Sequence, residues 1–369
     1  MKWKLVFFGL CLLSIATNAQ DRENKGHAVA AHVWLGKMIK HNERFTGPIP
    51  PISTAFQIEY LKQTLGEKKW HSQRNYPIIG AGALFIHYGY PEIYGSVIGV
   101  YPLLQIPIVK SNDFEWTAQI GAGIGYVTKH YSIENNQNVA IGSHINNVSP
   151  FSTDLRWHID PQWDVELGLS AVHVSNAAFA FPNLGINMWG VRAGARYYFA
   201  PRSPIEMAKE QETVSKKLMF SAKGSLAFVE KGFADGPKYP VYTASLWGRY
   251  QYNNVQKAIL GLEYTYNNAT AAFIHSLEEP VGKNGNIPYQ VSGFLGNEFL
   301  FGRLGVSVQV GYYLKKYQGL NSSFYQRLGG NYYFIQKEQG LFKELFLSLH
   351  LKTHQFTAEF CDLGLGFSF

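Results

Sequence analysis

A histidine and a serine stand two residues apart at the end of a segment in which apolar and polar side chains alternate. In residues 163–175 the apolar row begins at Trp163, and His173 and Ser175 continue this row rather than the polar one. Such alternation is typical of a β-strand with one apolar and one polar face. If the apolar face meets lipid, a general base and a nucleophile lie side by side at the membrane surface. This placement predicts an enzyme that attacks lipids.

The next amphipathic segment, residues 186–200, supplies a third polar group. Asn187 begins the apolar row that also contains Trp189, so it can reach His173 if the two segments pair as a hairpin. In acyl-transfer chemistry Ser175 would attack an ester carbonyl, and His173 would take the serine proton as the general base. Asn187 would then fix the tautomer and orientation of the imidazole ring.

Acyl transfer also needs hydrogen-bond donors for the oxyanion that develops on the carbonyl oxygen. The loop after Ser175 offers three candidates. They are the side chain of Asn183 and the backbone N–H groups of the turn formed by Asn176 and Ala177.

Two carboxylates on the same segment do not fit as partners of His173. Asp164 and Glu166 are separated from it by odd numbers of residues, so their side chains lie on the opposite face of the strand. We expect them to form a polar plug inside a barrel, together with Gln162, Arg192 and Arg196.

The whole chain divides into about sixteen such strand-like segments, each long enough to cross a bilayer with tilt. Short turns tend to alternate with longer loops, as they do in barrels of the bacterial outer membrane. The pattern predicts an all-β, antiparallel transmembrane β-barrel. By this count the segment that carries His173 and Ser175 runs outward and ends near the external surface.

Composition and both ends of the chain favour the same class. The chain has 36 Gly, 25 Phe, 23 Tyr and 8 Trp with only 16% charged residues, which suits a barrel with aromatic girdles. Residues 1–19 resemble a secretory signal peptide. The last segment alternates up to Phe369, which resembles the signal read by the barrel-assembly machinery. We expect an integral protein of a Gram-negative outer membrane.

The segments fall into two sets of eight. We expect an eight-strand half in residues 20–200, a polar spacer at 201–217 and a second β half in residues 218–369. One large barrel of about sixteen strands is the arrangement that we favour. Two eight-stranded barrels in tandem are the alternative, because the spacer would suit them.

Several other classes of protein and site are disfavoured. The net charge is +7 for the whole chain and +5 without Lys2 and Lys4 of the signal, and no basic helix or RNA-binding signature accompanies it, so nucleic acid is a poor partner. His130, His144 and His158 match no ligand spacing, and we expect no metal site.

The site segment resembles a known family. His173-Val174-Ser175-Asn176, followed by Pro182-Asn183-Leu184-Gly185, is similar to the lipid A 3-O-deacylase family (PagL-like, acyloxyacyl hydrolases), over about residues 28–200. The second half looks like that of the longer Bacteroidetes-type members. The resemblance implies an outer-membrane serine esterase that needs no cofactor and acts on lipid A, the anchor of lipopolysaccharide. It implies Ser175 as nucleophile, His173 as base and Asn183 as a group that helps to hold the oxyanion.

One position departs from the family's small enzyme, which has a glutamate twelve residues after the serine where this chain has Asn187. The outer-membrane phospholipase A family has a His-x-Ser pair with asparagine at that position, and it uses calcium. Phospholipid is therefore the alternative substrate, and calcium would be a cofactor only in that case. A third alternative is a non-catalytic barrel that serves as a pore or scaffold.

Overall fold

The computed structural model describes residues 24–41, 43–202, 217–277, 281–282, 285–337, 339–355 and 357–369. The predicted signal peptide, residues 1–19, and nearly all of the predicted spacer, residues 201–217, lie outside these ranges. No helix in the described part of the chain is long and apolar enough to span a membrane.

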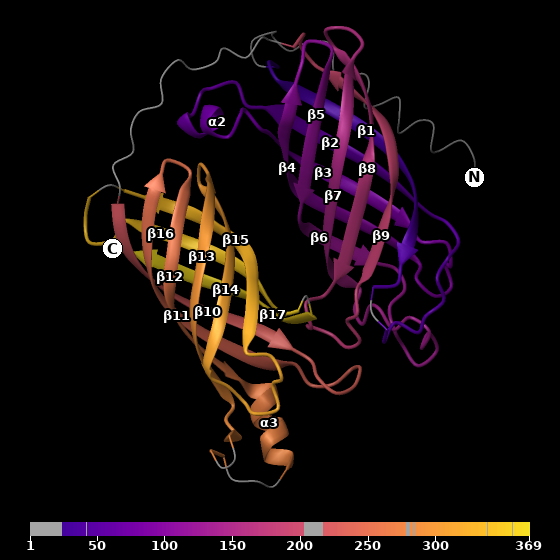
Figure 1. Cartoon of the computed structure of the whole chain (residues 1–369). Helices are drawn as coiled ribbons and strands as arrows, with labels where there is room; N and C mark the ends of the chain where they lie inside the picture. The colour runs from indigo at the N-terminus through magenta and orange to yellow at the C-terminus, as the bar shows by residue number, and fades with distance from the viewer. Residues whose placement is uncertain are drawn as a thin grey trace.

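The first half of the chain forms a barrel of antiparallel strands (Figure 1). The strands follow in the order β3-β2-β1-β9-β8-β7-β5-β4, and pairing of β3 with β4 closes the ring. The short strand β6 continues β5 and also pairs with both β4 and β7, so the wall is eight strands wide. A short helix, α2, follows β2. The elements are β1 His27–Ile39, β2 Ser53–Gln63, α2 Lys69–Gln73, β3 Ile78–His87, β4 Ser96–Lys110, β5 Phe114–Gly121, β6 Gly123–Val127, β7 Ile145–His158, β8 Trp163–Ser175 and β9 Ile186–Tyr198.

The second half forms a separate closed barrel of eight strands in sequential order. A helix, α3, extends from one end of this barrel (Figure 1). Asn267 caps the helix, because its side chain accepts hydrogen bonds from the N–H groups of Ala269 and Thr270. The elements are β10 Lys217–Val229, β11 Tyr239–Asn253, β12 Gln256–Asn267, α3 Asn268–Ser276, β13 Tyr289–Phe301, β14 Leu304–Lys315, β15 Phe324–Gln336, β16 Glu344–His354 and β17 Thr357–Ser368.

The all-β antiparallel barrel class is therefore confirmed, and so is the tandem alternative of two eight-stranded barrels. The expectation of one large barrel is wrong. The first and last strands of each half pair with each other, β1 with β9 and β10 with β17, so neither half keeps an open edge for the other. Alternation of side chains assigns a face to each strand, but it does not select the partner of an edge strand.

The two faces of the strands divide as the alternation predicts. On β8 the outward residues Leu167 and Leu169 are exposed, whereas Asp164 and Glu166 are buried in the lumen. The predicted polar plug is confirmed for these carboxylates and two arginines. Arg196 pairs with Glu166 at 2.7 Å. Asp164 pairs with Arg156 at 3.5 Å, and Arg192 pairs with Asp154 at 2.6 Å. The side-chain amide of Gln162 instead donates hydrogen bonds to the hydroxyl of Tyr197 and the carbonyl of Tyr198, at the end of β9. An eight-stranded barrel is just wide enough for such side chains to fill its interior.

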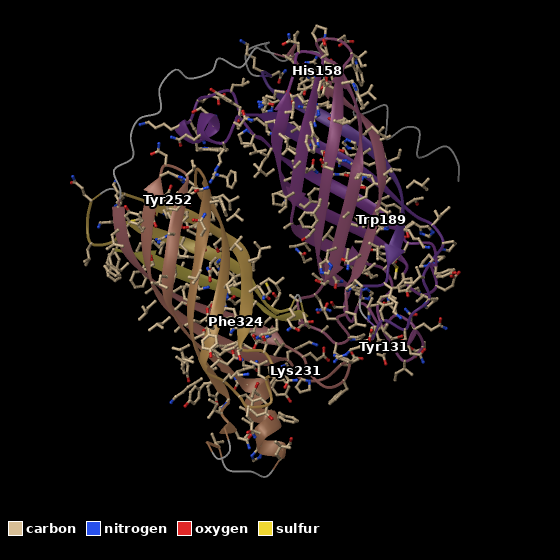
Figure 2. The ribbon with its side chains drawn as sticks, in the orientation of Figure 1. Tyr131, His158, Trp189, Lys231, Tyr252 and Phe324 are labelled. Carbon is tan, nitrogen blue, oxygen red and sulfur yellow. The ribbon has the colours of Figure 1, made fainter. Side chains whose placement is uncertain are left out.

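Corresponding ends of the two barrels lie on the same side of the molecule (Figure 2). Tyr131 and Lys231 lie in loops toward one end, and His158 and Tyr252 lie toward the other. At the end with His158, the Arg74 side chain of the first barrel donates hydrogen bonds to the carbonyl groups of Val255 and Leu300 in the second barrel. The opposite end, which has the longer loops, carries a second contact between the barrels that involves the predicted site.

Candidate active site

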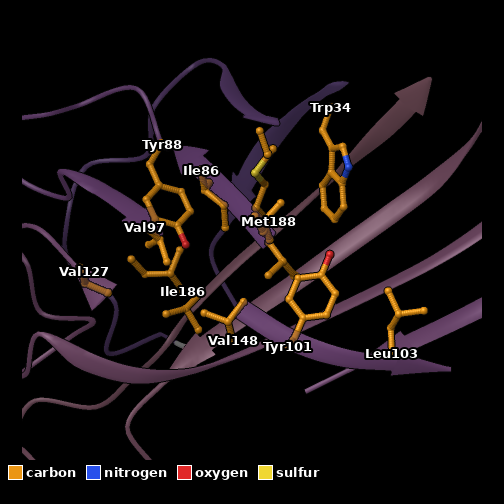
Figure 3. Packing of buried hydrophobic residues seen from close by; sticks show 14 of the residues in the cluster. Trp34, Ile86, Tyr88, Val97, Tyr101, Leu103, Val127, Val148, Ile186 and Met188 are labelled. Carbon is orange, nitrogen blue, oxygen red and sulfur yellow. The ribbon is translucent and has the colours of Figure 1, made fainter. Parts of the chain in front are cut away.

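The predicted site residues lie on the outward face of β8 and β9, at the end with the long loops. The two strands are antiparallel neighbours, and their register places His173 directly opposite Asn187. Ile186 and Met188 flank Asn187 and point inward to a buried apolar cluster (Figure 3). Because side chains alternate along a strand, burial of these two neighbours fixes Asn187 on the outward face.

The three polar side chains form a continuous hydrogen-bonded row. The Nδ1 atom of His173 lies 2.7 Å from Oδ1 of Asn187, and its Nε2 atom lies 2.9 Å from Oγ of Ser175. An amide oxygen can only accept a hydrogen bond, so Nδ1 carries the ring proton and donates it to Asn187. Nε2 is then free to accept the serine hydroxyl. This is the arrangement that a general base and its nucleophile require.

Ser175 is only 8% exposed, and the loop 176–185 begins at the next residue. The backbone N–H of Asn176 donates to Oδ1 of Asn183 at 2.9 Å, and the side-chain oxygen of Asn176 accepts from the N–H of Ala180 at 3.2 Å. Asn183 therefore holds the turn through its side-chain oxygen. The side-chain nitrogen of Asn176 is buried and has no hydrogen-bond partner among the described residues. Two donors near Ser175 in the chain are therefore not engaged by Asn183: this side-chain nitrogen of Asn176 and the backbone N–H of Ala177.

Gly185 closes the loop against the imidazole ring. Its φ of +78° is in the left-handed region, and a Cβ atom there would lie 2.8 Å from Cε1 of His173. Its N–H donates to the carbonyl of Ala140 at 3.0 Å, and His41 Nε2 contacts the neighbouring carbonyl of Leu184 at 2.9 Å. Only glycine fits this position without displacing the ring.

We expect Gly185→Ala to lower the turnover number by about 10- to 100-fold, since a misplacement of a reacting group by about 1 Å can cost about 100-fold. The added methyl group would push the ring away from Asn187 or Ser175. The measurement is steady-state kinetics, with Gly340→Ala as the control. Gly340 also has a positive φ, of +107°, but nothing lies within 4 Å of its added Cβ. Equal activity of the two variants would refute the role of Gly185.

Two polar residues at the site are not among those predicted from the sequence. On β7, Asn147 lies directly opposite Ser175 and Ser149 lies opposite His173. The hydroxyl of Ser149 donates to Oδ1 of Asn147 at 2.7 Å. Period-two alternation along residues 145–157 would have shown that these two polar side chains share an outward row with Phe151. The candidate site is thus a polar patch across three strands of an otherwise apolar wall.

The three histidines that the sequence suggested as metal ligands, His130, His144 and His158, do not join the row. His130 and His144 pack edge to face, with ring centroids 4.2 Å apart, whereas Nδ1 of His158 lies 2.9 Å from Asp164 at the opposite end of the barrel. Within the described ranges, no three His, Cys, Asp or Glu side chains are grouped as metal ligands.

Two closed barrels with apolar outer walls define an integral protein of the outer membrane, and the polar row on one wall has the groups of a hydrolase. The chain belongs to the lipid A 3-O-deacylase (PagL) family. The family model described as lipid A 3-O-deacylase (PagL) matches residues 54–196, and the one described as acyloxyacyl hydrolase, C-terminal domain, matches residues 215–369. The protein is thus an outer-membrane carboxylic ester hydrolase.

Solved structures add only distant likenesses. A crystal structure of the outer membrane enzyme PagL is 16% identical, with 45% of this chain and 97% of that chain covered and a TM-score of 0.31. A mutant of Rh. blastica porin is 10% identical over 93% of this chain and 99% of that chain, with a TM-score of 0.18. Pseudomonas aeruginosa OccK11 (OpdR) is 12% identical over 93% and 94%, with a TM-score of 0.22. TM-scores this low assign no residue. No curated protein matches the sequence.

Proposed function

We propose that this protein hydrolyses an ester-linked acyl chain of lipid A, with Ser175 as nucleophile, His173 as general base and Asn187 as the group that orients the base. The observation that supports this proposal is the continuous row of hydrogen bonds from Asn187 through His173 to Ser175. The row lies on the lipid-facing wall, where an acyl ester can reach it without leaving the membrane.

The reaction proceeds in two acyl transfers. Ser175 Oγ attacks the ester carbonyl while Nε2 of His173 takes the hydroxyl proton, and the proton is then given to the departing sugar oxygen. The same nitrogen next deprotonates a water molecule, which attacks the acyl-serine ester. The fatty acid leaves and Ser175 regains its proton. The N–H of Ala177 and the side-chain amide of Asn176 are the candidate donors to the oxyanion in both steps.

The position of the site suits this substrate. In barrels of the bacterial outer membrane the longer loops face outward. Ser175 is the last residue of β8 and adjoins the loop 176–185, so it lies at the level of the outer leaflet, which contains lipopolysaccharide. Buried ion pairs fill the lumen of the first barrel, and this filling does not favour transport through it.

The test is to incubate the purified protein with lipopolysaccharide in water enriched in oxygen-18 and to analyse the products by mass spectrometry. We expect lipid A that lacks one ester-linked chain, and a free fatty acid that carries the heavy oxygen. Hydrolysis would be excluded if the released chain lacked the label. The proposal for lipid A would be overturned if phospholipid were cleaved and lipid A were not.

Asn187 favours phospholipid as the second candidate substrate, because the phospholipase A family has asparagine at this position. The two candidates differ in their need for calcium. We propose that this protein needs none, and we expect that a chelator of divalent cations leaves the rate unchanged within about twofold once substrate packing is controlled. The measurement is the rate in mixed detergent micelles with EDTA or with added calcium. Restoration of a lost rate by calcium would favour the phospholipase mechanism.

A further inference from the structure

The second barrel contacts the first at the loop 176–185, which directly follows Ser175. Glu230 directly follows β10, and its backbone N–H donates to the carbonyl of Ala178 at 3.0 Å. Its side-chain Oε2 accepts the N–H of Phe181, also at 3.0 Å. One residue of the second barrel thus binds both ends of the segment 178–181, which lies between Ser175 and Asn183.

Glu230 is buried at this contact between the barrels. The residue is 3% exposed. Its Oε1 accepts the N–H of Gly236, and Oε2 also pairs with the ammonium group of Lys238. Lys238 in turn lies 5.4 Å above the ring centre of Phe179. A carboxylate held by several donors is rigid, and hydrogen bonds to a charged acceptor are stronger than those between neutral groups.

The loop needs an external support because its backbone is strained beside the nucleophile. Ala177 and Ala178 both have positive φ angles, +54° and +67°. For a residue with a Cβ atom this conformation is unfavourable and persists only where the surroundings impose it. The carbonyl of Ala178 is one of the two groups of this loop that Glu230 binds. The strained residues and the hydrogen bond from Glu230 that supports them therefore lie within three residues of Ser175.

We propose that the second barrel is a positioning element of the active site, and that Glu230 is the positioning residue through which it holds the loop 176–185 in place next to Ser175. This inference rests on the proposed function and gives the C-terminal half a role in the same reaction. Glu230 touches neither substrate nor the reacting atoms. It acts through the backbone of residues 178–181 on the turn at Asn176 and Ala177, which carries the candidate oxyanion donors.

The test uses the full-length protein in detergent micelles and compares Glu230→Ala with Glu230→Gln. A matched control is Glu92→Ala, which removes an exposed carboxylate from another loop at the same end of the first barrel. The first readout is the rate at which a fluorophosphonate probe labels Ser175, which requires an activated serine but no lipid A. The second is hydrogen exchange of the loop 176–185 by mass spectrometry. The third is the division of the kinetic effect between kcat and KM.

We expect Glu230→Ala to slow labelling and to lower kcat by about tenfold with little change in KM, because the loop loses a hydrogen bond to a charged acceptor that helps to hold it in place. Exchange in the loop should rise, and Glu230→Gln should recover part of both effects because its amide oxygen still accepts a hydrogen bond. Glu92→Ala should behave as wild type.

Two different failures are distinguishable. Labelling and loop exchange that are equal in Glu230→Ala and wild type would overturn the positioning role. If the wild type itself is not labelled at Ser175, the proposed function fails instead, and loop exchange alone still tests whether Glu230 orders the loop. Equal loss in the Gln and Ala variants with unchanged exchange would also contradict the inference.

Discussion

Ser175→Ala should lower the rate of lipid A deacylation by about 10³-fold or more, since loss of the nucleophile removes the covalent pathway and leaves only binding and oxyanion stabilisation. Ser175 Oγ is the atom that Nε2 of His173 contacts at 2.9 Å, and alanine offers no group that could replace it. The measurement is lipid A mass spectrometry on membranes of cells that express either form, together with kinetics of the purified proteins.

The control for this change is Ser170→Ala, which makes the same substitution on the same strand but on the lumen side. Ser170 is 5% exposed and its hydroxyl makes only a long contact, 3.4 Å, to the carbonyl of Gly190. Both variants should retain the heat-dependent gel shift of a folded barrel. Undiminished deacylation by Ser175→Ala would exclude this serine as the nucleophile. If neither lipid A nor phospholipid changes in a serine-dependent way, the results favour a non-catalytic scaffold over an enzyme.

Much of this architecture could be predicted from the sequence because a membrane barrel obeys one strong rule. Each strand must show apolar side chains to lipid and polar ones to the lumen, so alternation reveals both the strands and their faces. The outward row at His173 and Ser175, and its continuation at Asn187, were visible for this reason. The expectation that Asn187 reaches His173 followed once the two segments were assumed to form a hairpin, and the register of β8 and β9 satisfies that assumption.

The remaining features depend on contacts that alternation does not encode. Closure into two rings rests on the pairing of β1 with β9 and of β10 with β17, and the sequence pattern is the same for either partner. The contact of Glu230 with the loop 176–185 joins segments about fifty residues apart, and on the loop side it uses only backbone groups. Backbone donors and acceptors are present at every residue, so no side-chain pattern marks them. The use of the Asn176 N–H by Asn183 was hidden for the same reason.

The second large effect concerns stability, and it arises in the lumen of the first barrel. Arg192 on β9 and Asp154 on β7 form a bidentate pair, with Nε and Nη2 each 2.6 Å from a carboxylate oxygen. Both side chains are 1% exposed, and Nη1 of Arg192 also donates to Gln57 at 3.1 Å. The pair spans β8, so it ties the strands on both sides of the one that carries Ser175.

Asp154→Ala should lower the free energy of unfolding by about 3–5 kcal/mol, because it leaves the Arg192 charge buried without its partner. The double variant Asp154→Ala/Arg192→Met removes both charges and should recover most of that loss. Urea titration in detergent, followed by the gel shift and tryptophan fluorescence, measures both. The control is Asp113→Ala in the exposed turn between β4 and β5, which should stay within about 0.5 kcal/mol of wild type. A single variant as stable as this control, or a double variant less stable than the single one, would show that the lumen pair does not hold this wall of the barrel together.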